Sequence, residues 1–203
     1  MSFIEEMTTT IADGPQVDAF GRLRVSNPVT LFDNKMRYGK SSTLFSEVLQ
    51  GGATSVHDVN NSCVDMGVTT TGDIVVRQTR TRHKYQSGKS QLIEATGTIE
   101  PVVGVEKAIG YFQCSTTGTH DIWDGLCFES IDGVMYTSVY KQGVANRIPQ
   151  TSWNVDKLDG AGPSGVTIDW SRCQIFQIDL QWLGVGRVRY YVNVDGKSVL
   201  VNE

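Results

Sequence analysis

The sequence predicts an all-β fold, an antiparallel β-sandwich of jelly-roll or concanavalin-like topology with an extended N-terminal arm. Short runs of β-branched and aromatic residues alternate with polar residues, turn dipeptides separate these runs, and helical periodicity is almost absent. The chain contains 21 glycines among 203 residues. This length suits one domain with a substantial core. We expect the arm over residues 1–40 and the sandwich domain over residues 41–203, continuing beyond Glu203.

The arm is predicted from its turn residues and its isolated apolar side chains. Asp13-Gly14-Pro15 and Asn27-Pro28 interrupt any helix or long strand. The segment from Phe20 to Phe32 is nevertheless too apolar for a solvated linker. It suits addition as a strand to another protein surface, and folding back onto its own domain is the alternative.

Several strands are expected in the middle of the chain, over residues 74–79, 91–96 and 108–114. Asp132-Gly133 predicts a tight hairpin between residues 126–131 and 134–140, because both residue types tolerate a positive φ. Residues 42–50 are ambiguous in type, since their apolar side chains also fit helical spacing.

The C-terminal third predicts two more strands and a second hairpin. In residues 174–182 alternate side chains are apolar, which predicts one buried and one wet face. The expected buried residues are Phe176, Ile178, Leu180 and Trp182, and the expected wet residues are Gln177, Asp179 and Gln181. Residues 187–194 alternate in the same way, and Asp195-Gly196 predicts a turn into residues 197–201.

Composition argues against several classes of function. The formal charge is −4 and basic residues form no patch, so we expect no nucleic-acid partner. No run approaches 18 apolar residues and the N-terminus is acidic, so we expect a soluble chain without a membrane partner or secretory signal. The four cysteines include no CxxC pair, so we expect reduced core thiols and no metal.

Motifs of catalysis are absent from the sequence. The three Gly-Lys-Ser tripeptides lack the upstream glycine of a phosphate-binding loop, and no Gly-x-Ser-x-Gly occurs. We therefore expect no enzymatic activity and no cofactor.

One loop combines an aromatic residue with possible sugar ligands. Its candidate glycan-binding residues are His120, Asp121, Trp123 and Asp124. An aromatic ring beside carboxylates at the end of a sandwich is how lectin-like modules hold sugars. The alternative is that Trp123 closes the sandwich edge.

Two blocks resemble a known family. Residues 19–26 (AFGRLRVS), Pro28 and residues 30–33 (TLFD) are followed much later by Asp169-Trp170-Ser171 and residues 174–189. These blocks resemble a family of virion structural proteins of tailed bacteriophages.

The resemblance implies a structural component of a virion that is assembled in the host cytoplasm. The arm would attach the chain to capsid, neck or tail proteins, as in a fibre or decoration protein, and a homo-oligomer, most plausibly a trimer, is expected. The expected partner-binding residues are Phe20, Arg22, Leu23, Arg24, Val25, Leu31 and Phe32. The alternative function is a carbohydrate-binding, lectin-like module, free or on a particle, that recognises a surface glycan or host receptor.

Overall fold

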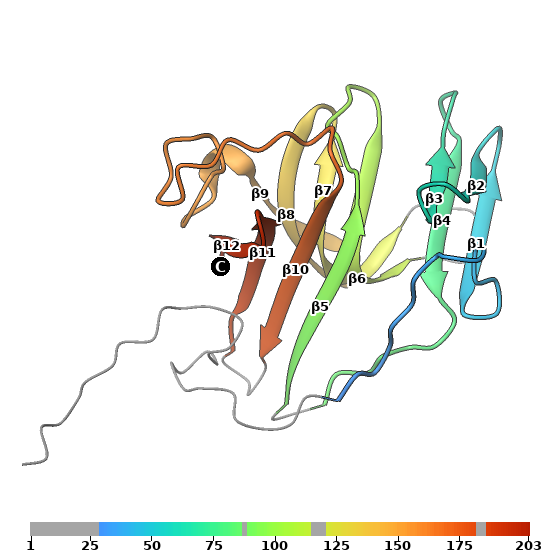
Figure 1. Ribbon diagram of the computed structural model, residues 1–203, viewed down its shortest axis with the longest axis horizontal. Coiled ribbons are helices and arrows are strands. Elements are labelled where there is room, and N and C mark those ends of the chain that lie inside the picture. The colour runs from blue at the N-terminus through green and yellow to red at the C-terminus, as the bar shows by residue number, and fades with distance from the viewer. Residues whose placement is uncertain (1–28, 87–88, 115–120, 182–185) are drawn as a thin grey trace, which may run out of the picture. The chain divides into compact units, whose positions relative to one another are not determined.

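The computed structural model describes residues 29–86, 89–114, 121–181 and 186–203. The expectation of an all-β fold of antiparallel sheets, the kind found in β-sandwiches, is confirmed. Twelve strands and one short 3-10 helix, η1 (Gln150–Ser152), make up the regular structure of these residues (Figure 1). None of their helical segments is long and apolar enough to cross a membrane.

The strands form four antiparallel sheets. The strands are β1 (Phe45–Gln50), β2 (Thr54–Asp58), β3 (Cys63–Gly67), β4 (Ile74–Thr79), β5 (Ser90–Gly97), β6 (Glu106–Cys114), β7 (Ile122–Ile131), β8 (Val134–Lys141), β9 (Val144–Pro149), β10 (Gln174–Gln181), β11 (Val188–Val194) and β12 (Lys197–Asn202). Two sheets have four strands, in the orders β12-β11-β10-β5 and β6-β7-β8-β9, and two are the pairs β1-β4 and β2-β3.

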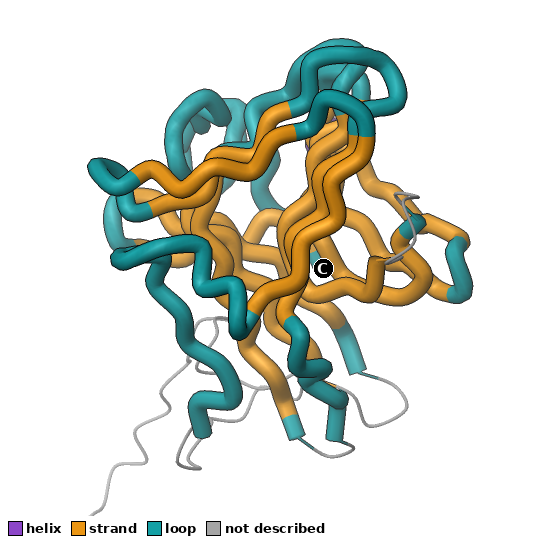
Figure 2. Tube along the Cα trace, turned by 90° about the vertical axis from the view of Figure 1, so that its right-hand side faces the viewer, coloured by secondary structure: helices purple, strands orange, loops and turns teal. Residues whose placement is uncertain are grey.

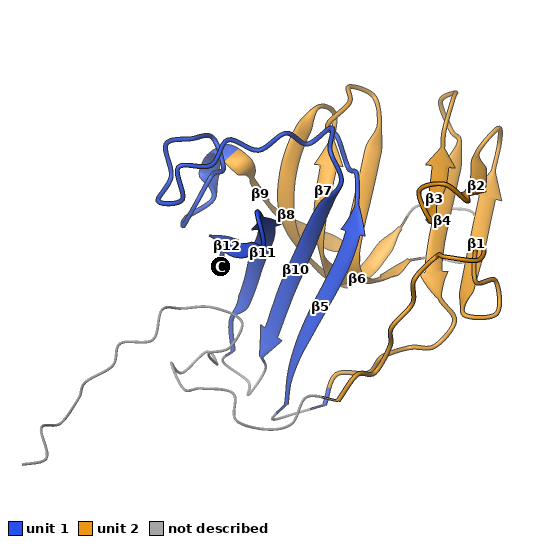
Figure 3. Cartoon of the chain, viewed as in Figure 1, with its two compact units in different colours: residues 1–27, 86–100, 151–203 blue, residues 28–85, 101–150 orange. Residues whose placement is uncertain are grey.

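The described chain divides into two compact units (Figure 3). Unit 1 contains residues 86–100 and 151–203, and unit 2 contains residues 28–85 and 101–150. Unit 1 therefore holds the sheet of β5 and β10–β12, whereas unit 2 holds the other three sheets. This grouping differs from the expected boundary between an arm over 1–40 and one domain over 41–203.

The apolar face of the unit 1 sheet packs against the long loop that precedes β10. Phe176 and Ile178 are buried as predicted. The Trp170 ring stacks on Phe176 with a centroid distance of 6.2 Å, and it meets Trp153 edge-on at 6.3 Å. The loop is also tied to β12, because the backbone amides of Val155 and Asp156 both donate to the carbonyl of Val201.

The opposite face of this sheet corrects the sequence prediction. Gln177, Asp179 and Gln181 were expected to be wet, yet all three are buried. Asp179 lies directly opposite Arg189, and Arg189 donates from Nε at 3.0 Å and from Nη2 to the same carboxylate oxygen. The alternation of apolar and polar residues predicted an exposed face, because it takes no account of partners on other strands. Here Asp179 can be buried because Arg189, on the neighbouring strand, neutralises its charge.

Tight turns fix the register of both four-stranded sheets (Figure 2). The predicted hairpins at Asp132-Gly133 and Asp195-Gly196 are confirmed, with positive φ at every one of these residues. Gln142-Gly143 makes a third turn of the same kind between β8 and β9. Such two-residue turns match the twist of the strands that they join.

The ambiguous segment 42–50 contains a strand. Phe45–Gln50 pairs antiparallel with β4, from Phe45 opposite Thr79 to Gln50 opposite Ile74. The pairing partner is distant in the sequence, so local spacing alone did not determine the type of this element.

The four cysteines are free thiols. Cys114 and Cys127 are buried, in agreement with the prediction of core thiols, but Cys63 is half-buried and Cys173 is exposed. The prediction therefore holds for two of the four positions.

Candidate functional site

The first candidate site is the junction between the N-terminal segment and unit 2, which we define as residues 32–41. The Phe32 ring meets Phe45 edge-on with a centroid distance of 5.7 Å, and it packs against His83 at 5.4 Å. Leu31, immediately before it, is 62% exposed. Phe32 thus packs against the chain's own residues, although the sequence suggested it as a contact to a partner.

The other expected partner-binding residues lie outside the described part of the chain. They are Phe20, Arg22, Leu23, Arg24 and Val25. Of the seven residues, Leu31 is the one described with an exposed apolar side chain.

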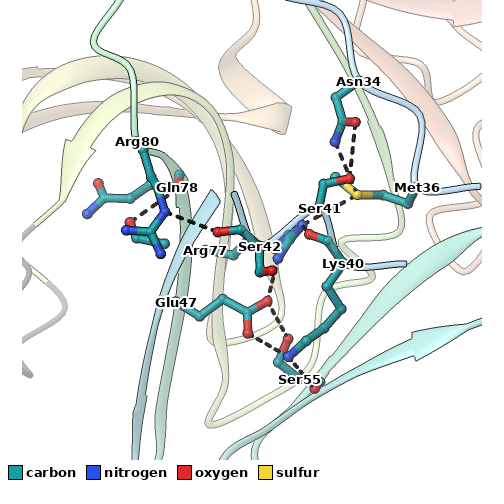
Figure 4. Close-up of polar contacts among 11 residues, drawn as sticks. Asn34, Met36, Lys40, Ser41, Ser42, Glu47, Ser55, Arg77, Gln78 and Arg80 are labelled. Carbon is teal, nitrogen blue, oxygen red and sulfur yellow. Dashed lines mark hydrogen bonds and ion pairs between the residues drawn. The ribbon is translucent and has the colours of Figure 1, made fainter. Parts of the chain in front are cut away.

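A carboxylate at the centre of the junction joins three elements. Glu47 of β1 accepts from Lys40 Nζ at 2.6 Å, from Ser55 Oγ at 2.9 Å, and from Arg77 on the paired strand β4 (Figure 4). Burial alone would raise the pKa of Glu47, but the hydrogen bonds from Lys40, Ser55 and Arg77 outweigh it and lower that pKa. The carboxylate is therefore ionised at neutral pH and holds Lys40 against β1 and β2.

The Arg77 guanidinium fixes the backbone of the junction. Its side chain is 7% exposed, it donates to the carbonyl of Lys40, and it lies 4.2 Å above the centroid of the Phe45 ring. On the other side, His57 Nε2 lies 2.6 Å from the carbonyl oxygen of Met36. The junction is thus fastened to β1, β2 and β4 through side chains instead of strand pairing.

The second candidate site is a hollow of about 320 Å³ in unit 2. Its lining residues are Glu106, Asp121, Ile122, Trp123, Tyr140, Gly143 and Arg147. They come from the sheet β6–β9 and its connections, so a regular scaffold positions them.

A buried carboxylate organises the residues beneath the hollow. Glu129 is 2% exposed and accepts from the hydroxyls of Ser138 and Tyr140 and, at 3.1 Å, from Arg147 Nε. Arg147 Nη2 also donates to the Tyr140 hydroxyl oxygen at 2.7 Å. Strand register places these side chains on one face of β7, β8 and β9, since Ser138 lies opposite both Cys127 and Arg147.

The protonation states of Tyr140, Cys127 and Arg147 suit the binding of a ligand better than the transfer of a proton. Burial, together with the hydrogen bond to Glu129, raises the pKa of Tyr140 well above its ordinary value. Burial also raises the pKa of the Cys127 thiol. Burial alone would lower the pKa of Arg147, but the bond to Glu129 reverses this and raises it. Tyr140 and Cys127 therefore stay neutral, and Arg147 stays charged, at ordinary pH.

Trp123 stands at the rim of the hollow. It is 54% exposed, and its backbone carbonyl accepts from Gly143 N at 2.7 Å. The positive φ of +77° at Gly143 favours glycine in this turn. The turn therefore holds the backbone of Trp123 beside the hollow.

The structure brings together only part of the predicted glycan-binding loop. Asp121 and Trp123 both line the hollow. Asp124 Oδ1 instead accepts from Gln142 N at 2.9 Å and so stabilises the turn between β8 and β9. His120 lies outside the described residues.

Sequence reasoning missed the residues beneath the hollow. Glu129 and Arg147 belong to strands that are about twenty residues apart in sequence, and no motif links them. The one available signal was a carboxylate, Glu129, within the largely apolar second half of its strand, residues 126–131, where an ionised group requires partners.

A group of possible metal ligands is better explained as a turn. Ligand atoms of Asp58, Cys63 and Asp65 lie within 4.8 Å of one another. However, the Asp58 carboxylate accepts from the backbone amides of Asn60 and Asn61 and from Asn61 Nδ2. These bonds close the β2–β3 hairpin and lower the pKa of Asp58.

Comparisons with other proteins add no family assignment. No family model matches the chain, and no curated protein and no solved structure is a significant match.

Proposed function

We propose that the chain is a structural component of a tailed-phage virion, attached to capsid, neck or tail proteins through its N-terminal arm. The single observation that carries the proposal is the fastening of residues 32–41 to β1, β2 and β4, directly after the sequence block that resembles virion proteins. An arm that attaches the chain to a partner must itself be held firmly to the rest of the chain, and the contacts of residues 32–41 hold it in this way.

The physical basis of attachment is a small number of apolar anchors repeated over several copies. Phe20 and Leu23 are the largest apolar side chains of residues 19–26, and Arg22 and Arg24 would pair with acidic groups of the partner. Each buried anchor contributes roughly 1.5–3 kcal/mol. Several symmetric copies would then convert modest individual contacts into stable attachment.

Two truncations test this proposal. A chain lacking residues 1–27 keeps the junction, and we expect it to fold but not to be incorporated into particles. A chain lacking residues 1–41 also loses the partners of Glu47 and Arg77, so we expect it to be less stable as well. Circular dichroism reports the fold, and co-sedimentation with particles assembled in infected cells reports incorporation.

A double substitution gives a finer test without deletion. Phe20→Ala with Leu23→Ala should weaken attachment by about two or more orders of magnitude. Val103→Ala, at an exposed side chain of the loop before β6, is the matched control and should attach normally. Normal particle loading by the chain lacking residues 1–27 would refute the attachment role of the arm.

A second candidate function is carbohydrate recognition by the hollow. The observation that favours it is the exposed Trp123 ring beside the free carboxylate of Asp121 and the guanidinium of Arg147. This function uses residues other than those of the arm, so the two functions are compatible.

A further inference from the structure

The lining of the hollow indicates which kind of sugar it would hold. The exposed face of Trp123 offers a flat apolar surface of the kind on which the C–H face of a pyranose ring packs. A volume of about 320 Å³ lies at the lower end of small-molecule sites, which run from about 300 to 1,000 Å³. This size suits one sugar ring and part of its neighbour.

Donors and acceptors are both available at the hollow. The Asp121 carboxylate is exposed and makes no hydrogen bond to any residue that the structure describes, so it can accept from ligand hydroxyls. Arg147 uses Nε and Nη2 for Glu129 and Tyr140, which leaves Nη1 without a bond to the described residues. Because Glu129 is buried and holds the guanidinium, this donor is fixed before a ligand arrives.

The charges at the hollow disfavour anionic ligands. The Asp121 carboxylate lines it, while the positive charge of Arg147 is already compensated by Glu129 beneath it. An anionic ligand would be repelled by Asp121 and would find no uncompensated cation among the lining residues. A neutral polyhydroxyl ring makes hydrogen bonds with both the carboxylate and the guanidinium and meets no such repulsion.

We propose that the hollow binds an uncharged pyranose unit of a glycan, with its ring stacked on Trp123 and its hydroxyls bonded to Asp121 and Arg147. This inference rests on the second candidate function and adds to it the class of sugar. Glu129 is a positioning residue, since it holds Arg147 and is not among the residues that line the hollow.

Binding of simple glycosides to the full-length chain tests the proposal. Methyl glycosides of glucose, galactose, mannose and N-acetylglucosamine serve as neutral probes, and the methyl glycoside of glucuronic acid serves as the acidic probe, with saturation-transfer NMR and calorimetry as readouts. We expect at least one neutral probe to bind, and the glucuronide to bind at least tenfold more weakly than the best neutral probe.

Substitutions then locate the site and test the charge argument. Trp123→Ala should lower the affinity for the best neutral probe by about tenfold or more, whereas Val103→Ala should leave it unchanged. Asp121→Asn should lower the affinity for the neutral probe. It should also reduce the difference in affinity between the neutral and acidic probes, because it removes a carboxylate that repels the acidic one.

The possible failures are distinguishable. If no probe binds and a glycan array also shows no binding, both the inference and carbohydrate recognition are refuted. If the glucuronide binds best and Trp123→Ala abolishes that binding, carbohydrate recognition stands and the neutral class is wrong. If a trimethyl-lysine peptide binds instead at Trp123, the hollow is a cation site and both are refuted. None of these outcomes affects attachment to particles, which the truncations test separately.

Discussion

At the scale of single residues, two carboxylates organise the sites of unit 2. Glu47 and Glu129 each accept hydrogen bonds from three side chains, which lie on three elements for Glu47 and on β8 and β9 for Glu129. An ionised carboxylate has enough acceptor capacity for three donors, so it can join strands that a neutral side chain could not. Removing such a group leaves several donors without a partner at once.

Glu129→Ala should therefore destabilise the protein strongly. It leaves the Ser138 and Tyr140 hydroxyls and the Arg147 Nε without this acceptor, and a buried donor left unsatisfied costs about 1–3 kcal/mol. Urea unfolding followed by tryptophan fluorescence measures the change. Asp33→Ala, at an exposed carboxylate that makes no hydrogen bond to the described residues, is the control and should cost less than about 1 kcal/mol. Equal effects of the two substitutions would contradict the role of the buried group.

The raised pKa of Tyr140 predicts a loss of stability in alkaline solution. A tyrosine in the unfolded chain has a pKa of 10.0, whereas burial and the bond to Glu129 raise that of the folded state. The stability contributed by the neutral hydroxyl is therefore fully present below about pH 10 and is lost as the pH rises through the folded-state pKa. Tyr140→Phe should flatten the fall of the unfolding free energy above pH 10. Tyr38→Phe, at a side chain that is 92% exposed, should not change the slope.

At the scale of elements, turn chemistry was predictable and burial was only partly so. Asp132-Gly133 and Asp195-Gly196 allowed two hairpins to be predicted, because few residue pairs tolerate a positive φ at two successive positions. Strands β2 and β3 escaped prediction because their residues, TSVHD and CVDMG, lack a long apolar alternation. The buried polar face with Asp179 escaped because its compensating partner Arg189 belongs to another strand.

In the candidate sites, too, features that depend on neighbouring residues were predictable and features that depend on distant residues were not. Asp121 and Trp123 were found from the sequence because they are close neighbours in it. Arg147 and Glu129 were not, since only strand pairing over sheet β6–β9 brings them together. Phe32 shows the converse: its apolar character was recognised, but its contacts with Phe45 and His83 depend on distant residues.

A pair of aspartates in equivalent turns allows a matched test of a tertiary hydrogen bond. Asp132 and Asp195 occupy the same turn position, with φ values of 47° and 50°. Asp132 Oδ1 also accepts from Gly104 N at 3.0 Å, a bond for which Asp195 has no counterpart among the described residues. Both substitutions to alanine should destabilise the protein through backbone strain, and Asp132→Ala should cost an additional 0.5–1.5 kcal/mol or so. Chemical denaturation of the two variants measures the difference. Equal denaturant concentrations at the two unfolding midpoints would contradict a contribution from the bond to Gly104.

At the scale of the whole molecule, the two units are interleaved along the chain. Within the described residues the chain passes between them near residues 85, 100 and 150. Unit 1 is thus built from segments that flank a large part of unit 2 in sequence. Neither unit corresponds to one continuous stretch of chain, so the truncations that test attachment must be made at the N-terminus and not between the units.

The last prediction concerns the association of copies. In the described part of the chain, β9 is the outer strand of its sheet, and it begins with Val144, which is 72% exposed. An outer strand presents unpaired backbone groups to solvent, and a symmetric contact with a second copy can cover them. We therefore expect the chain to associate as a trimer. Light scattering at micromolar concentration should then give about 67 kDa, three times the chain mass of 22.3 kDa.

Val144→Lys should shift this equilibrium toward the monomer, because it places a charge on the outer strand, where association would have to bury it. Val103→Lys adds the same charge on a loop and should leave the mass unchanged. A wild-type chain that scatters as a 22.3 kDa monomer would contradict association altogether. An associated chain that responds equally to both lysines would contradict the assignment of the contact to β9, while leaving the association itself intact.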